Sequence, residues 1–266
     1  MKIELLSQIP AKIMRPSPIL FVHGAWHGAW CWEKYFMPYF AKQGFAAYAL
    51  SLRGHAGSDG APCLRRFRVK DYVEDVHRVA SRLSRPPILV GHSLGGHVVQ
   101  KYLEIYQSPA AVLMASVPVG GIVKMLKRLG RNHPWLFFKV NFSFSLYPFI
   151  STRRMAREML FSDDMKETDV DEYFPKLQDE SYFCFLDMLA FAPIRPQRVK
   201  SPVLVMGAEN DNVFYRRDIR KTGRAYNQKA IILADTAHDI MLERNWRQAA
   251  DIILSWLGTQ ERNPAR

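Results

Sequence analysis

The pentapeptide Gly91-His-Ser-Leu-Gly95 restricts the fold of this chain more than any other feature of the sequence. An apolar run at residues 88–90 precedes it, and a helix-compatible segment follows at 97–106. A sharp turn from strand to helix forces its central residue into strained backbone angles, and flanking glycines let neighbouring segments approach. The Ser93 hydroxyl is then exposed at a helix N-terminus, whose dipole favours developing negative charge. The pattern predicts that Ser93 is a nucleophile.

Short apolar runs of strand length recur along the chain and alternate with segments of helical period. Apolar residues between Val69 and Leu83, and between Trp246 and Leu257, each fall on one helical face. Runs that are apolar throughout and alternate with helices are typical of a parallel sheet covered on both faces. An α/β fold with a mostly parallel sheet is therefore predicted. The predicted strands are residues 19–22, 46–50, 88–90, 111–115, 203–206 and 231–233.

One long interruption of this alternation lies between the runs at 111–115 and 203–206. We predict that residues 119–200 form an inserted cap, and that residues 1–118 and 201–266 form the core. Charge is segregated inside the interruption. Residues 117–157 contain eight Lys or Arg and no acidic residue, whereas residues 158–187 contain ten Asp or Glu and two Lys.

A serine at its ordinary pKa needs a general base that a third group orients. Of the eight histidines, His238 fits best, because it lies between the run at 231–233 and the C-terminal helix. Asp211 follows the run at 203–206, so we expect it at the same sheet edge as Ser93 and His238. Glu209 is the alternative acid.

Acyl transfer also needs backbone N–H groups where the carbonyl oxygen becomes an oxyanion. Leu94, directly after the nucleophile, supplies one. The second is expected from Ala25, in the glycine-rich loop after the run at 19–22, with Trp26 as the alternative donor. Trp26 is also expected to border the substrate pocket.

Together these residues resemble the α/β-hydrolase superfamily over nearly the whole chain. The order Ser93, Asp211, His238 is the order in that family. The dipeptide His23-Gly24 is similar to its HG oxyanion motif, and Arg53-Gly-His-Ala-Gly-Ser58 is similar to its RGHGxS loop. The resemblance implies an α/β-hydrolase fold that carries a helical cap inserted after the sixth strand.

The segment 23–32 is particularly similar to the branch with plant methyl esterases and hydroxynitrile lyases. The lyases carry a hydroxyl residue where this chain has Gly24, which argues against lyase activity. Haloalkane dehalogenases and epoxide hydrolases carry an aspartate where this chain has Ser93. Ser51 stands where many members carry Asp, a departure that concerns the packing of the loop rather than catalysis.

The resemblance implies a serine hydrolase that cleaves carboxylic esters with an apolar acyl or aryl part through an acyl-enzyme, in the manner of esterases and lipases. His238 would take the Ser93 proton, and Asp211 would stabilise the imidazolium. Thioester hydrolysis, C–C bond hydrolysis and biosynthetic acyl transfer or cyclisation use the same triad and remain alternatives, as does a non-catalytic receptor. This chemistry needs neither a metal nor an organic cofactor.

The net charge of +12 admits nucleic acids and anionic membranes as partners. No nucleic-acid-binding motif accompanies the charge, so the expected partner is a small-molecule ester. Cys31, Cys63 and Cys184 lack zinc-ligand spacing, and the N-terminus lacks an apolar run of signal-peptide length. A cytoplasmic protein with free thiols is predicted.

The stretch 133–150, HPWLFFKVNFSFSLYPFI, is the most aromatic of the chain. It is shorter than the roughly 20 apolar residues of a membrane span, and Lys139 and Asn141 interrupt it. Because it falls within the predicted cap, we expect part of it to line the acyl or aryl side of the pocket, with packing inside the cap as the alternative. The pocket candidates are Trp135, Phe138, Phe142, Phe144 and Tyr147.

The segment before it has a basic amphipathic pattern, which is compatible with docking on an anionic membrane or with binding an acidic substrate. A cap helix whose charged face is solvated, or paired with residues 158–187, is the favoured interpretation, and peripheral membrane association stays open. The apolar face is Ile122, Met125, Leu126 and Leu129, and the basic residues are Lys124, Lys127, Arg128 and Arg131.

Overall fold

The six predicted strands and one further strand pair in one seven-stranded sheet. The computed structural model describes residues 1–262, and every strand pairing in it is parallel except that of β1 with β3. In spatial order the strands are β1 (Leu5–Gln8), β3 (Ala47–Leu50), β2 (Ile19–Val22), β4 (Ile88–His92), β5 (Ala111–Met114), β6 (Val203–Ala208) and β7 (Ile231–Leu233).

Burial explains why these runs are apolar at consecutive positions. Every residue of β2, β4, β5 and β6 is buried, as expected of parallel strands that helices cover on both faces. β1 is the exception, because it lies at the edge of the sheet and is mostly exposed. Its mixed composition is the reason that no strand was predicted there.

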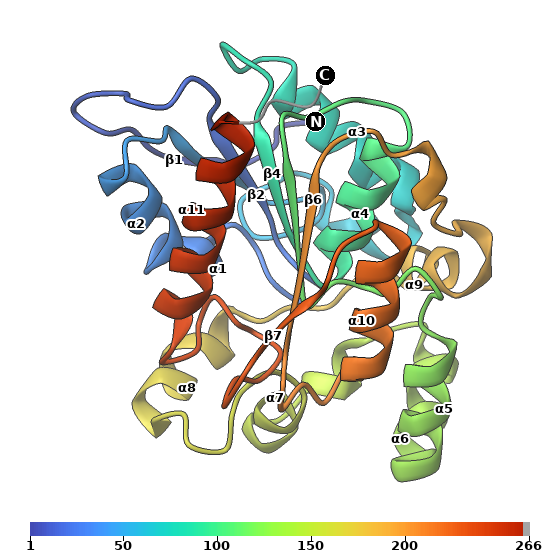
Figure 1. Ribbon diagram of the computed structural model, residues 1–266. Helices are drawn as coiled ribbons and strands as arrows, with labels where there is room; N and C mark the ends of the chain where they lie inside the picture. The colour runs from blue at the N-terminus through green and yellow to red at the C-terminus, as the bar shows by residue number, and fades with distance from the viewer. Residues whose placement is uncertain (263–266) are drawn as a thin grey trace.

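Helices cover both faces of the sheet (Figure 1). The apolar faces predicted at 69–83 and 246–257 belong to α3 (Val69–Ala80) and α11 (Trp246–Arg262). α3 packs against α4 (Leu94–Leu103), and α11 contacts α2 (Phe36–Lys42). On one face lie α1 (Trp30–Glu33), α2 and α11, and on the other lie α3, α4 and α10 (Arg216–Ala225).

The chain between β5 and β6 adds no strand to the described sheet, and we call residues 119–200 the inserted segment. It leaves the sheet after β5, the fifth strand in chain order. The predicted position after a sixth strand was wrong, because the chain before Ile19 supplies only β1. The helical elements of the segment are α5 (Val123–Asn132), α6 (Pro134–Ser143), η2 (Tyr147–Ile150), α7 (Arg153–Leu160), α8 (Glu167–Tyr173), η3 (Phe174–Lys176), α9 (Tyr182–Leu186), the π-turn η4 (Asp187–Phe191) and η5 (Pro196–Arg198).

Polar contacts hold the inserted segment over the carboxyl ends of the strands. The Gln178 side chain accepts a hydrogen bond from the Ala56 amide (2.7 Å) and donates one to the Gly54 carbonyl (2.9 Å), in the loop after β3. The fully buried Glu180 accepts a hydrogen bond from the Tyr72 hydroxyl at 2.8 Å. In Figure 1 α5 to α8 lie beyond one end of the sheet, and both termini lie near the other. Among residues 1–262, no helix is long and apolar enough to cross a bilayer.

Candidate active site

Ser93 forms the turn between β4 and α4, and its backbone is strained. Its φ of 50° and ψ of −115° fall in a region that side chains with a Cβ rarely adopt. Gly95 allows this turn, because a Cβ there would lie 2.4 Å from the carbonyl oxygens of both Val22 and His23. The strand, the strained residue and the helix predicted from the pentapeptide are therefore present.

Two loops bring a histidine and a carboxylate to this serine. His238 follows β7, and its Nε2 lies 3.0 Å from the Ser93 Oγ. Asp211 follows β6, and its Oδ2 lies 3.0 Å from the His238 Nδ1. All three side chains are buried. In this arrangement the imidazole can accept the serine proton while the carboxylate holds the ring and balances its charge.

The loop after β6 selects Asp211 over Glu209 as the partner of the histidine. The Oδ1 of Asp211 accepts hydrogen bonds from the amides of Val213 (2.6 Å) and Phe214 (2.9 Å), which leaves Oδ2 for His238. Glu209 instead pairs with Arg216 at 2.7 Å on the surface.

A second buried carboxylate, that of Asp239, directly follows His238 in the sequence. Asp239 is fully buried and accepts a 2.8 Å hydrogen bond from the His27 Nε2. Burial disfavours the charge of His27, but the attraction of Asp239 outweighs it and raises the pKa of His27 above its usual value. Burial likewise disfavours the charge of Asp239, and His27 nevertheless lowers the pKa of that carboxyl. The two residues are therefore a buried ion pair.

A hydrogen bond from His92 holds the loop that carries His238 in place. Burial, reinforced by His238, lowers the pKa of His92 to about 3, so its ring is neutral. Its Nε2 lies 3.0 Å from the His238 carbonyl oxygen, to which it donates a hydrogen bond. Sequence reasoning gave no role to His27, His92 or Asp239. The available signal was their position: His27 lies in the glycine-rich loop that carries Ala25, His92 directly precedes the nucleophile, and Asp239 directly follows the base.

His92, His238 and Asp239 each offer an atom that could contribute to a metal site. Both ring nitrogens of His238, however, are already hydrogen-bonded to Ser93 and Asp211. The arrangement therefore suits proton transfer rather than metal binding.

Both residues predicted to supply the oxyanion donors border the cavity at Ser93. Leu94 is the first residue of α4, where backbone amides have no acceptor within the helix. Ala25 borders the same cavity as Ser93 and Leu94. Gly24 brings this loop close to the nucleophile, since a Cβ on it would lie 2.6 Å from the His92 Nδ1 and 3.0 Å from the Ser93 Cβ.

A narrow apolar cavity of about 40 Å³ opens onto Ser93. Small-molecule sites usually exceed about 300 Å³, so a ligand of more than a few atoms requires the walls to move. The walls come from the loops after β2, β5 and β6, from the start of α4 and from the inserted segment. They are Ala25, Trp26, Leu94, Val117, Ile122, Met125, Leu129, Leu146, Phe149, Met159, Phe185, Met188, Val213 and Phe214.

Part of the aromatic stretch 133–150 borders this cavity, as predicted, but it does so through Leu146 and Phe149. The prediction was wrong for five of the six individual pocket residues proposed. Trp26 lies in the wall, but the other five side chains are on the surface. α6 turns only Val140 fully inward and packs against α5, whose own apolar face supplies Ile122, Met125 and Leu129 to the cavity. The five exposed residues are Trp135, Phe138, Phe142, Phe144 and Tyr147.

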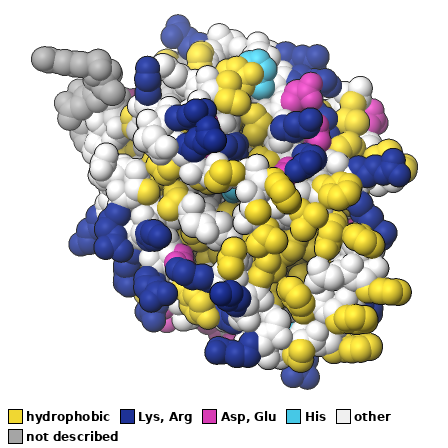
Figure 2. All heavy atoms as spheres, turned by 90° about the vertical axis from the view of Figure 1, so that its right-hand side faces the viewer, with side chains coloured by type: hydrophobic (Ala, Val, Ile, Leu, Met, Phe, Trp, Pro, Cys, Tyr) yellow, Lys and Arg dark blue, Asp and Glu magenta, His cyan; other side chains and the backbone are white. Residues whose placement is uncertain are grey.

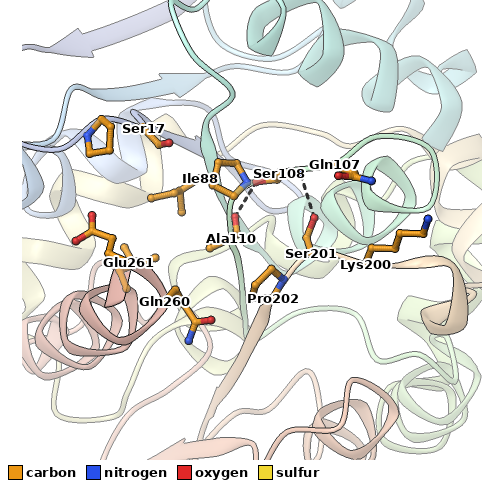
Figure 3. A pocket seen from close by; sticks show the side chains of 13 residues that line it. Ser17, Ile88, Gln107, Ser108, Ala110, Lys200, Ser201, Pro202, Gln260 and Glu261 are labelled. Atoms are coloured by element: carbon orange, nitrogen blue, oxygen red, sulfur yellow. Dashed lines mark hydrogen bonds between the residues drawn. The ribbon is translucent and has the colours of Figure 1, made fainter. Parts of the chain in front are cut away.

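A wider pocket of about 370 Å³ lies at the opposite end of the sheet (Figure 3). It borders the amino ends of β4 and β6, where the Ser108 amide donates to the Ser201 Oγ at 3.0 Å. The Ser108 Oγ lies 2.7 Å from the carbonyl oxygen of Pro87 and 2.8 Å from that of Ala110, and its single proton can be donated to either. This serine therefore lacks the base that Ser93 has.

A family model described as the alpha/beta hydrolase family matches residues 19–252. A curated relative, methyl jasmonate esterase 1 of Vitis vinifera, is 34% identical over 100 residues. That match spans 37% of this chain and 38% of the relative, so less than half of either protein is compared.

Several solved structures resemble the whole chain. A monoacylglycerol lipase of Paleococcus ferrophilus has a TM-score of 0.73 at 21% identity, with 97% of this chain and 98% of that one covered. A bromoperoxidase of Bacillus anthracis has a TM-score of 0.74 at 16% identity, with 96% and 95% covered. A structure from a study of carboxylesterases of Nitrososphaera gargenis has a TM-score of 0.73 at 19% identity, with 98% and 96% covered. At these identities the likeness shows a common fold.

Proposed function

Because the chain belongs to the alpha/beta hydrolase family, we propose that it is a serine hydrolase that cleaves carboxylic esters with an apolar acyl or aryl part. The observation that carries the proposal is the pair of 3.0 Å hydrogen bonds that links Ser93 through His238 to Asp211. The partial match to a methyl jasmonate esterase and the likeness to a lipase support ester chemistry in particular.

In the proposed first half-reaction, the Ser93 Oγ attacks the ester carbonyl carbon while His238 Nε2 takes the serine proton. The Asp211 carboxylate accepts the Nδ1–H hydrogen bond and stabilises the imidazolium. The amides of Leu94 and Ala25 donate to the oxyanion as it forms. His238 then gives its proton to the departing alcohol, and the acyl group stays on Ser93.

In the second half-reaction, His238 takes a proton from water as the water oxygen attacks the acyl carbon. The tetrahedral intermediate collapses, the proton returns to Ser93, and the carboxylic acid leaves. The strained backbone at Ser93 and the hydrogen bond from His92 keep the serine and the imidazole in place through both halves.

The cavity indicates which esters fit. Its walls carry no ionisable side chain, so an uncharged and apolar acyl or aryl group is favoured over a charged one. Its small volume favours short acyl groups unless the inserted segment moves away from the core.

Turnover of p-nitrophenyl esters tests the proposal. We expect the wild-type chain to hydrolyse p-nitrophenyl acetate and butyrate, and Ser93→Ala to lose this activity. Ser108→Ala is the matched control, since it removes a buried serine at the far end of the sheet. If activated esters are not hydrolysed, or if both variants retain turnover, the proposed function is wrong.

A further inference from the structure

The outer face of α6 carries a ridge of exposed aromatic rings. Trp135, Phe138 and Phe142 follow one another at helical spacing, and 77%, 57% and 79% of their respective surfaces are exposed. Neighbouring rings stack, with centroids 5.6 Å apart for the first pair and 6.0 Å for the second. We call these three residues the aromatic ridge. Burying them inside the protein would stabilise it, so their exposure indicates a contact outside it.

The face of α6 opposite the aromatic ridge packs against the protein, so the ridge faces away from it. Phe137 lies 3.8 Å from the Cβ position of Gly130 on α5, and Val140 is buried. Further large apolar side chains are exposed in the inserted segment, and Figure 2 shows hydrophobic side chains gathered across this side of the molecule. They are Val123, Phe144, Tyr147, Phe183 and Phe191.

Positive charge accompanies the ridge. Lys127 and Arg131 on α5 and Lys139 on α6 are exposed, and we call them the basic set. Within residues 1–262 none of the three forms an ion pair. The sequence has no Asp or Glu from 119 to 157, so no carboxylate of α5 or α6 offsets this charge.

We propose that the aromatic ridge and the basic set dock this protein on the surface of an anionic lipid bilayer. Aromatic rings with an apolar body suit the boundary between headgroups and acyl chains, and Lys and Arg are attracted to anionic headgroups. The chain has no membrane-spanning helix among its described residues, so the contact is peripheral.

Repulsion between like charges disfavours a second copy of this chain as the partner that covers the aromatic ridge. A symmetric contact through α6 would bring two basic sets together with no carboxylate from either α5–α6 pair to balance them. The ridge is exposed on α6, and the helix pair α5 and α6 extends beyond the sheet (Figure 1). Such a ridge suits insertion into a soft interface.

The docking surface adjoins the cavity wall. α5 lines the cavity through Met125 and Leu129, and α6 packs on α5. A bilayer seated on α6 would therefore lie one helix away from the cavity. Delivery of lipid-dissolved esters to Ser93 rests on the proposed function, whereas the docking itself does not.

Vesicle co-sedimentation tests the docking with the full chain. The vesicles are pure phosphatidylcholine or phosphatidylcholine with about a third phosphatidylserine. We expect at least tenfold tighter binding to the anionic vesicles, and weaker binding as salt screens the charges. Ser93→Ala is measured alongside, so that a failure of the proposed hydrolase activity leaves this result interpretable.

Two triple variants separate the apolar and the charged contributions. Replacing the aromatic ridge by alanine should weaken binding at least tenfold. Replacing the basic set by glutamine should weaken it about a hundredfold, since each cation near an anionic surface is worth about fivefold. The matched controls are the exposed residues Ile9, Ile13 and Ile105 changed to alanine, and Lys12, Lys42 and Lys221 changed to glutamine.

The position of Trp135 provides a second readout. Brominated acyl chains should quench more of the wild-type fluorescence than of the Trp135→Phe fluorescence. Equal binding to neutral and anionic vesicles, no binding, or control variants that weaken binding equally would overturn the proposal. It would also be overturned if the ridge instead mediates a dimer, or captures an acidic protein, without binding vesicles.

Discussion

Removal of one buried histidine should change how the stability of this protein depends on pH. His97 lies on α4, one turn after the nucleophile, and its side chain is 1% exposed. Burial, and to a lesser extent the nearby Lys101, lowers the pKa of His97 to about 3. The native state therefore keeps the ring neutral over a pH range in which the unfolded chain takes up a proton.

The magnitude follows from the two pKa values. The unfolded pKa is 6.5 and the folded pKa is about 3, so the unfolded state binds more protons below pH 6.5, and stability falls as pH falls. The slope approaches about 1.4 kcal/mol per pH unit below pH 6.5 and lessens only near the folded pKa. Integrated from pH 7 to pH 5, His97 alone costs the native state about 2 kcal/mol.

Urea unfolding of the wild type and of His97→Leu at pH 7 and pH 5 measures this contribution. All other ionisable groups are common to the two proteins, so the difference between the two pH dependences isolates His97. The variant should lose about 2 kcal/mol less than the wild type between pH 7 and pH 5. Val99→Ala on the same helix should lower stability equally at both pH values. If His97→Leu keeps the full wild-type loss, His97 is not held neutral by burial.

The remaining predictions concern the candidate active site. Asp211→Asn should lower kcat/KM for esters about 10⁴-fold with little loss of stability, because the amide oxygen can still accept from Val213 and Phe214 but cannot balance an imidazolium. Asp239→Asn should instead lower the free energy of unfolding by about 3–5 kcal/mol, since it leaves the charge of His27 buried without a partner, and urea unfolding distinguishes the two variants. Phe214→Ala should enlarge the cavity and move the preferred p-nitrophenyl ester to a longer acyl chain; an unchanged preference would show that Phe214 does not limit chain length.

The turn at the nucleophile and the meeting of the three triad residues could be predicted from the sequence, because local sterics determine the first and sheet topology determines the second. The strained turn at Ser93 could be predicted because the pentapeptide 91–95 carries glycines at the positions where a side chain would collide with neighbouring backbone. The meeting of Ser93, Asp211 and His238 follows from the topology, because each residue comes after a parallel strand and such loops share one edge of the sheet.

Features that depend on packing between distant parts of the chain could not be predicted from the sequence. The apolar residues of α6 are spread around the helix, so hydrophobic periodicity does not indicate which face packs inward, and the sequence favours placing the aromatic residues in the pocket. The ion pair of His27 with Asp239 joins residues 212 positions apart, and only the folded chain brings them together. β1 escaped prediction because an exposed edge strand has no apolar pattern to detect.

Covalent labelling of Ser93 tests the account most directly. A fluorophosphonate reacts with a serine only where a neighbouring base activates it, and peptide mass spectrometry identifies the modified residue. We predict one adduct, on Ser93, with labelling lost in Ser93→Ala and strongly slowed in His238→Ala. Ester turnover by a protein whose Ser93 stays unlabelled, or whose label lies on another residue, would contradict the account.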